Sequence, residues 1–66
     1  MDFVDVVGER SRTYLYKNDV RLALTGVTKV CVRPNGDHRL ELASGKKVVV
    51  TAGFLAVELD SDAWTV

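Results

Sequence analysis

The side chains best suited to chemistry in this 66-residue chain are one histidine, one cysteine and a short acidic run near its end. General acid–base catalysis needs a histidine or a perturbed carboxylate beside a partner group. His38 follows the turn-forming run Pro34-Asn35-Gly36-Asp37, so we expect its ring to pack at the end of a hairpin. Cys31 falls on the opposite side of the alternating pattern from His38. This excludes a Cys31–His38 nucleophile pair and favours Cys31 as a small, half-buried packing residue.

Metal and cofactor chemistry find no support in the spacing of the ligand residues. The segment "ELDSDAW" carries Glu58, Asp60 and Asp62, but it lacks the glycine and the twelve-residue spacing of a calcium loop. One cysteine and one histidine cannot supply the ligands of a zinc site. No glycine-rich phosphate loop is present. The sequence therefore predicts a protein that is not an enzyme and that has no metal and no cofactor.

Basic residues and tyrosines recur at alternate positions through the first half of the chain. Six of them form the predicted partner-binding face: Arg12, Tyr14, Tyr16, Arg21, Lys29 and Arg33. Tyrosine and arginine dominate the energetics of protein interfaces, so a protein partner is the first interpretation. Cations around exposed rings also suit single-stranded nucleic acid, which is the alternative. A net charge of zero is unusual for a nucleic-acid-binding domain and makes that alternative the weaker one.

The charges are also sorted along the chain. All nine Lys and Arg lie between Arg10 and Lys47 beside three acids, which leaves a net charge of +6, while the two ends together carry −6. Such segregation is a hint of charged partners or of self-pairing. It also arises by chance in a small chain whose ends lie side by side.

The elements that position these residues are predicted to be strands. β-Branched and aromatic residues dominate, and apolar residues recur with period two, as in half-buried strands. We expect strands at residues 3–7, 12–17, 20–24, 28–33, 38–43, 46–51 and 54–60. Turn-forming residues separate them, and those at Asn18-Asp19, Pro34-Asn35-Gly36 and Ser44-Gly45 predict tight hairpins.

The alternation predicts one aliphatic face and one basic, partly aromatic face. On the second expected strand, Thr13 and Leu15 are assigned to the inside, and Arg12 and Tyr14 to the outside. A sheet with one buried face and no helix to cover it should close on itself or pair with another copy. The fold class is thus all-β: a small antiparallel meander, residues 1–66 forming a single domain, closing into an SH3-like barrel or roll of five to seven short strands.

Size and composition complete the expectation. A chain this short has marginal stability, and with a single cysteine it cannot form an internal disulfide, so self-association is expected to help. The apolar run "KKVVVT" would be prone to aggregate as a bare edge. Trp64 is expected to cover the open barrel end, and docking on a neighbouring molecule is the alternative. Without an apolar run long enough to span a membrane or a basic leader, the sequence predicts a cytoplasmic binding module, of the kind that bacteria and phages use as accessory or regulatory proteins.

Overall fold

The computed structural model describes residues 2–64, so Met1, Thr65 and Val66, which the expected single domain includes, lie outside it. Within this range the chain forms seven strands, each overlapping a predicted one, and the all-β prediction is confirmed. They are β1 (Val4–Asp5), β2 (Glu9–Leu15), β3 (Arg21–Leu24), β4 (Val27–Val32), β5 (His38–Leu42), β6 (Lys47–Val50) and β7 (Ala56–Ser61). A short 3-10 turn, η1 (Lys17–Asp19), joins β2 to β3. No helix in the described part of the chain is long and apolar enough to cross a membrane.

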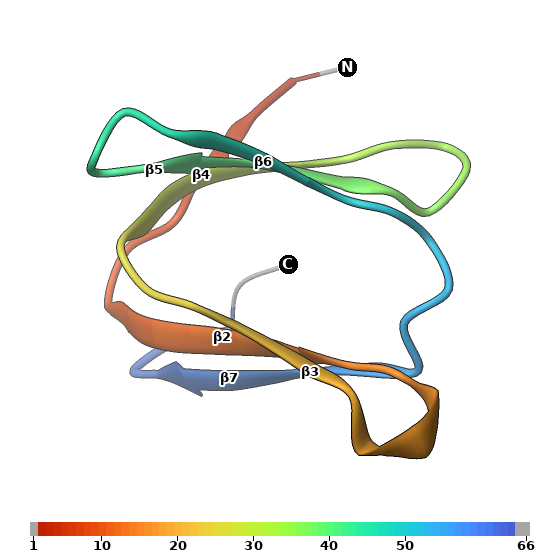
Figure 1. The fold of residues 1–66 in the computed structure, drawn as a ribbon. Coiled ribbons are helices and arrows are strands. Elements are labelled where there is room, and N and C mark those ends of the chain that lie inside the picture. The colour runs from red at the N-terminus through yellow and green to blue at the C-terminus, as the bar shows by residue number, and fades with distance from the viewer. Residues whose placement is uncertain (1, 65–66) are drawn as a thin grey trace.

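The strands form two antiparallel sheets that lie one above the other (Figure 1). The first sheet has the order β1-β4-β5-β6, and the second has the order β3-β2-β7. Neither sheet closes on itself within residues 2–64. The strands β6 and β7 are therefore edge strands of different sheets.

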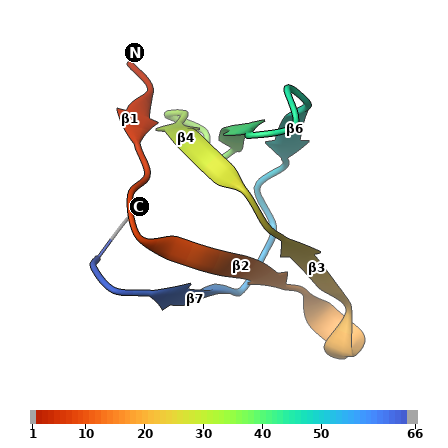
Figure 2. The ribbon, with the colours of Figure 1, turned by 90° about the vertical axis from the view of Figure 1, so that its left-hand side faces the viewer.

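One long, bent hairpin connects the two sheets. Its first arm runs through β1 and β2, and its second arm returns through β3 and β4 (Figure 2). The arms stay paired across the bend, because the amide of Val6 donates to the carbonyl oxygen of Thr28 at 2.9 Å. At the tip, Asn18 and Asp19 take positive φ values of 61° and 59°, which Asn and Asp tolerate better than other residues with a side chain. The predicted Asn18-Asp19 turn is confirmed.

The Pro34-Asn35-Gly36 turn is also formed as predicted. The amide of Gly36 donates to the carbonyl of Arg33 at 2.9 Å, and Gly36 has φ +94°, a value that favours glycine. The side chain of Asp37 accepts a 2.6 Å bond from the amide of Ala52. This turn therefore also holds the connection between β6 and β7 in place.

The core lies between the sheets, and one strand faces it in the opposite phase from the prediction. Val30, Leu40 and Val50 are buried as expected, but so are Tyr14 and Arg12, which were assigned to the outside. The register explains the reversal, because Tyr14 is paired with Leu22 and Val57, on the aliphatic side of both neighbouring strands. A directly paired residue shares its neighbours' face of the sheet, so Thr13 and Leu15 take the outer face.

Candidate functional site

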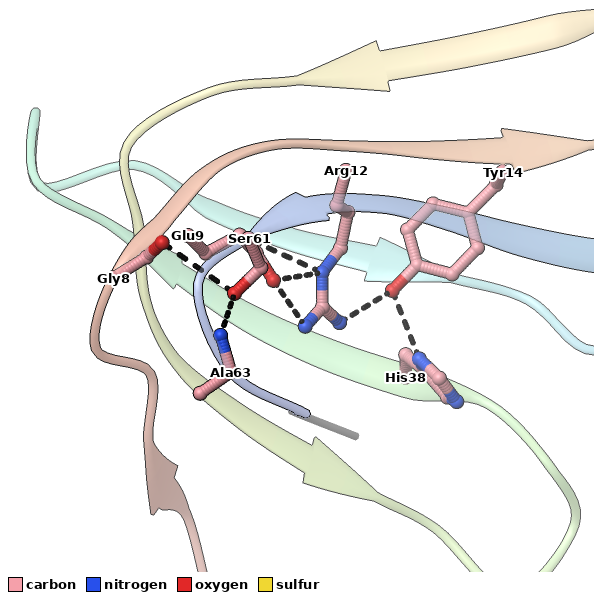
Figure 3. Close-up of polar contacts among 7 residues, drawn as sticks. All are labelled: Gly8, Glu9, Arg12, Tyr14, His38, Ser61 and Ala63. Atoms are coloured by element: carbon pink, nitrogen blue, oxygen red, sulfur yellow. Dashed lines mark hydrogen bonds and ion pairs between the residues drawn. The ribbon is translucent and has the colours of Figure 1, made fainter.

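A continuous chain of buried polar groups crosses the core from β2 to β5 (Figure 3). The guanidinium of Arg12 donates from Nη2 to Oε1 of Glu9 at 2.8 Å and from Nη1 to the hydroxyl of Tyr14 at 3.1 Å. The same hydroxyl lies 2.8 Å from Nδ1 of His38. The side chains of Arg12 and Glu9 are 0% and 1% exposed. Water is therefore excluded from the Glu9–Arg12–Tyr14–His38 chain, which we call the buried relay.

A β-bulge explains how Glu9 and Arg12 meet. Residues three apart on a regular strand lie on opposite faces. The pairing of β2 with β7 shifts between Glu9 and Ser11, which leaves Arg10 as the extra residue. A bulge advances the alternation by one residue, so Glu9 and Arg12 both point inward. Arg10 remains outside and binds Asp60 at 2.9 Å and Asp62 at 2.7 Å.

The electrostatics of the relay favour one arrangement of protons. Burial lowers the pKa of His38, and the charge of Arg12 lowers it further, so the ring is neutral at pH 7. Burial raises the pKa of Tyr14, against the opposing hydrogen bond from Arg12. Since the Tyr14 oxygen accepts from Arg12, its own proton is directed to Nδ1 of His38. His38 then carries its proton on Nε2.

This arrangement of buried side chains orders the core. The rings of Tyr14, His38 and Phe54 meet edge to face, with centroids 5.0–5.5 Å apart. His38 is only 8% exposed, and no member of the relay lines the cavity beside Val57 and Leu59 or the cavity beside Leu15 and Val20. The expectation that His38 packs at a hairpin end is confirmed. Its partner Tyr14 was not foreseen.

The six residues of the predicted contact face do not share a surface. Arg12 and Tyr14 are buried, so their assignment to an exposed face is wrong, and Tyr16 packs half-buried against the core. Arg21 is exposed on the second sheet, while Lys29 is exposed on the first. Arg33 is half-buried at the Pro34 turn. The remaining exposed members are cations without rings.

A shallow groove of about 410 Å³ runs beside the edge strand β7. Val57, Leu59 and Ser61 line it from the inner face of β7, and residues 62–64 complete it. Trp64 is 99% exposed, so the prediction that it covers the end of the core is wrong. The groove combines an apolar floor with a large exposed ring at the free edge of a sheet.

The ion pairs explain the sorted charges of the sequence. Each pair observed among the described residues joins an acid near one chain end to a base of the middle segment. They are Arg10–Asp60, Arg10–Asp62, Arg12–Glu9, Arg21–Glu58 and Lys29–Asp5. The bases that take part in none of these pairs are Lys17, Arg33, Arg39, Lys46 and Lys47. Three of these five lie on β5, on β6 or in the turn between them.

The remaining candidates for chemistry are not arranged for it. Cys31 is 2% exposed, more deeply buried than the expected half-buried packing residue. Across residues 2–64, no group of three His, Cys, Asp or Glu side chains is placed to hold a metal ion. Sequence reasoning missed Glu9, whose only signal was an acid three residues before an arginine. Comparison of the chain with protein-family models, with curated proteins and with solved structures finds no match.

Proposed function

We propose that this protein is a non-enzymatic interaction module that binds an extended segment of a protein as an additional strand beside β7. One observation carries the proposal: the apolar groove of Val57 and Leu59, with Trp64 exposed at its side, follows the free edge of β7. Strand addition uses main-chain hydrogen bonds for affinity and alternate side chains for specificity. A segment added to this edge would place every second side chain in the groove.

The outer side of the same strand gives the proposed ligand its charge. Glu58 and Asp60 are exposed on the outer face of β7, on the opposite side from Val57 and Leu59. A ligand strand beside β7 would therefore meet apolar side chains on one face and carboxylates on the other. The chemistry that fits is a strand in which apolar and basic residues alternate.

We further propose that the two sheets form a partly open SH3-like barrel, with its opening between β6 and β7. The bent hairpin supports this, because both of its arms pass from one sheet to the other. β5 and β6 extend the first sheet beyond the hairpin, and β7 extends the second. Of the four edge strands β1, β6, β3 and β7 in the described part of the chain, β6 and β7 lie one on each side of this opening and are available for strand addition.

Single-stranded nucleic acid is the weaker alternative. Lys29, Arg39 and Lys47 are exposed and lie on the outer face of the first sheet, which favours phosphate contacts. However, Asp5 and Glu41 occupy the same face, and the tyrosines needed for base stacking point elsewhere. We also propose a cytoplasmic location, because the single cysteine is buried and unpaired, as is common in reducing compartments.

Selection from a displayed library of random peptides tests the proposed function. Peptides with alternating apolar and basic residues should be enriched on the wild-type protein, and the enrichment should be lost on Trp64→Ala and Leu59→Lys. Trp64 is almost fully exposed, so Trp64→Ala should keep the fold. Leu59 is half-buried and paired with buried Arg12, so circular dichroism must show that Leu59→Lys is folded before its loss of enrichment is counted. Arg39→Glu is the control, because Arg39 lies on β5, away from β7. Enrichment that survives Trp64→Ala and Leu59→Lys would contradict the proposal.

A further inference from the structure

We propose that the segment added to β7 is β6 of a second copy of this chain, so that copies join edge to edge. The inference rests on the proposed function and identifies its ligand. β6 carries part of the chemistry deduced for that ligand: it presents one basic residue, Lys47, on its outer face and two apolar residues, Val48 and Val50, on its inner face. Both edges belong to the same molecule: the edge at β6 supplies a lysine and valines, and the edge at β7 supplies a carboxylate and an apolar groove.

The free edge of β6 is exposed and apolar. β6 pairs only with β5 in the described part of the chain, and Val49 is 58% exposed. The amide of Leu42 donates to the carbonyl of Lys46, which starts the ladder between β5 and β6. Antiparallel pairing alternates from there, so Val48 and Val50 bond to β5, while the main-chain groups of Lys47 and Val49 point to the free edge. An exposed apolar edge of this kind is a template for pairing with another chain.

The charges of the two edges are complementary. Lys47 is the first residue of β6 and Lys46 precedes it in the turn, and neither takes part in an ion pair observed among residues 2–64. Glu58, on the outer face of β7, is 63% exposed and lies 3.7 Å from Arg21, a contact too long and too open to satisfy its charge. Opposite charges across a new strand pair would steer the two edges together.

One parallel register satisfies both the faces and the hydrogen-bonding phase of the joined sheet. The amide of Tyr16 bonds to Val20 on the side of β3, so by alternation Glu58 bonds to β2, and the main-chain groups of Val57 and Leu59 point to the free edge of β7. These edge-pointing residues face inward on β7, whereas Lys47 and Val49 face outward on β6, and parallel pairing keeps the two faces aligned. Placing Lys47 opposite Glu58 on the outer face then brings Val48 opposite Leu59 on the inner face, and a shift of two residues would separate Lys47 from Glu58.

The consequence is an assembly that can grow from either edge. β6 of one copy uses β7 of the next, so the contact is heterologous and leads to a ring or to an open chain of copies. A symmetric contact of β6 with β6 is the competing geometry. In that geometry, centred on Val49, Lys47 would face Thr51 of the other copy and Glu58 would take no part.

Charge reversal and mixing of variants distinguish these geometries. We would measure the mass of the protein by sedimentation velocity over a concentration series, starting from the 7.3 kDa of one chain. The wild type should associate, and Lys47→Glu or Glu58→Lys alone should raise the dissociation constant by about tenfold or more, because like charges then face each other. An equimolar mixture of the two variants should restore association, since each interface then regains one Lys and one Glu. Lys29→Glu and Asp5→Lys make the same charge changes on β4 and β1, away from β6 and β7, and should associate as the wild type does.

Two results would overturn the inference. The first is a wild-type protein of one-chain mass at all concentrations. The second is a mixture of Lys47→Glu and Glu58→Lys that stays as dissociated as its components, which would exclude their contact. Circular dichroism confirms that each variant is folded. In either case peptide selection on β7 still decides the proposed function, because displayed peptides can bind the groove of a single copy.

Discussion

Replacing Tyr14 with phenylalanine tests the buried relay by removing one atom from its centre. The hydroxyl of Tyr14 accepts from Arg12 at 3.1 Å and lies 2.8 Å from Nδ1 of His38. Phenylalanine keeps the ring and its edge-to-face contacts with His38 and Phe54. The substitution therefore deletes two hydrogen bonds and leaves the shape of the core almost unchanged.

The cost follows from burial and charge. A hydrogen bond to a charged group contributes about 1.5–3 kcal/mol, and one between neutral groups contributes about 0.5–1.5 kcal/mol. We therefore expect Tyr14→Phe to lower the free energy of unfolding by about 2–4 kcal/mol. For a domain of this size that corresponds to a fall in Tm of roughly 10–30 °C. This is a large share of the stability that so small a protein can have.

Tyr16→Phe is the matched control. Tyr16 lies on the same arm of the hairpin, is half-buried, and its hydroxyl makes no hydrogen bond observed among residues 2–64. Its removal should change the free energy of unfolding by no more than about 0.5 kcal/mol. Urea denaturation followed by circular dichroism measures both variants. Equal effects of Tyr14→Phe and Tyr16→Phe would refute the relay, because they would place the two hydroxyls in equivalent surroundings.

Three further predictions concern the relay and its surroundings. The pKa of His38 is lowered in the folded state, so the stability of the fold should be fully present above the unfolded pKa of about 6.5. The free energy of unfolding should decline as pH falls through the folded pKa, by up to about 1.4 kcal/mol per pH unit. Urea midpoints at pH 7.5 and 5.5 check this, and an equal decline in His38→Gln would contradict it. Glu9→Gln should lower the free energy of unfolding by about 3–5 kcal/mol, because it removes the carboxylate charge that Glu9 places beside buried Arg12. Asp60→Asn should change the free energy of unfolding only slightly, and thermal unfolding of the two variants tests the contrast. Asp37→Ala should free the connection between β6 and β7, because it removes the 2.6 Å bond to the amide of Ala52; faster amide exchange at Ala52 would show this, and unchanged exchange would argue against it.

Turn chemistry and alternation were sufficient to predict the strands. The Asn18-Asp19 and Pro34-Asn35-Gly36 turns demand backbone conformations that few other residues accept, and both occur where predicted. On β3, β5, β6 and β7 the aliphatic residues face the core as expected, although Leu22, on the edge strand β3, stays 36% exposed. Local patterns succeed here because each strand carries one clearly apolar face.

The phase of β2 was mistaken because the sequence does not reveal its bulge. An alternation that continues through Arg10 places Glu9 and Arg12 on opposite faces, and an unbalanced arginine belongs outside. With the bulge, Glu9 neutralises Arg12 inside, and Tyr14 fills the space between the sheets. A second shift in pairing, between Val27 and Lys29, places both Val27 and Val30 inside and Thr28 outside.

The candidate site could not be predicted for a related reason. The six-residue contact face depended on the phase of β2, and it disappears when Arg12 and Tyr14 turn inward. The groove beside β7 depends on which strands are left at the edges, and strand order is a property of the whole fold. The warning that "KKVVVT" needs a partner was visible in the sequence, and β6 is an edge strand in the structure.

The central claim is that this protein binds its partners at the free sheet edges. Residue-resolved hydrogen exchange at the edge of β6 tests this claim most directly. The amide of Val49 points to the free edge and should exchange rapidly in dilute solution, then markedly more slowly at concentrations where copies associate. The amide of Leu40, in the centre of the first sheet, should not change in parallel. If the mass rises with concentration while exchange at Val49 stays the same, association uses another surface and the account is wrong.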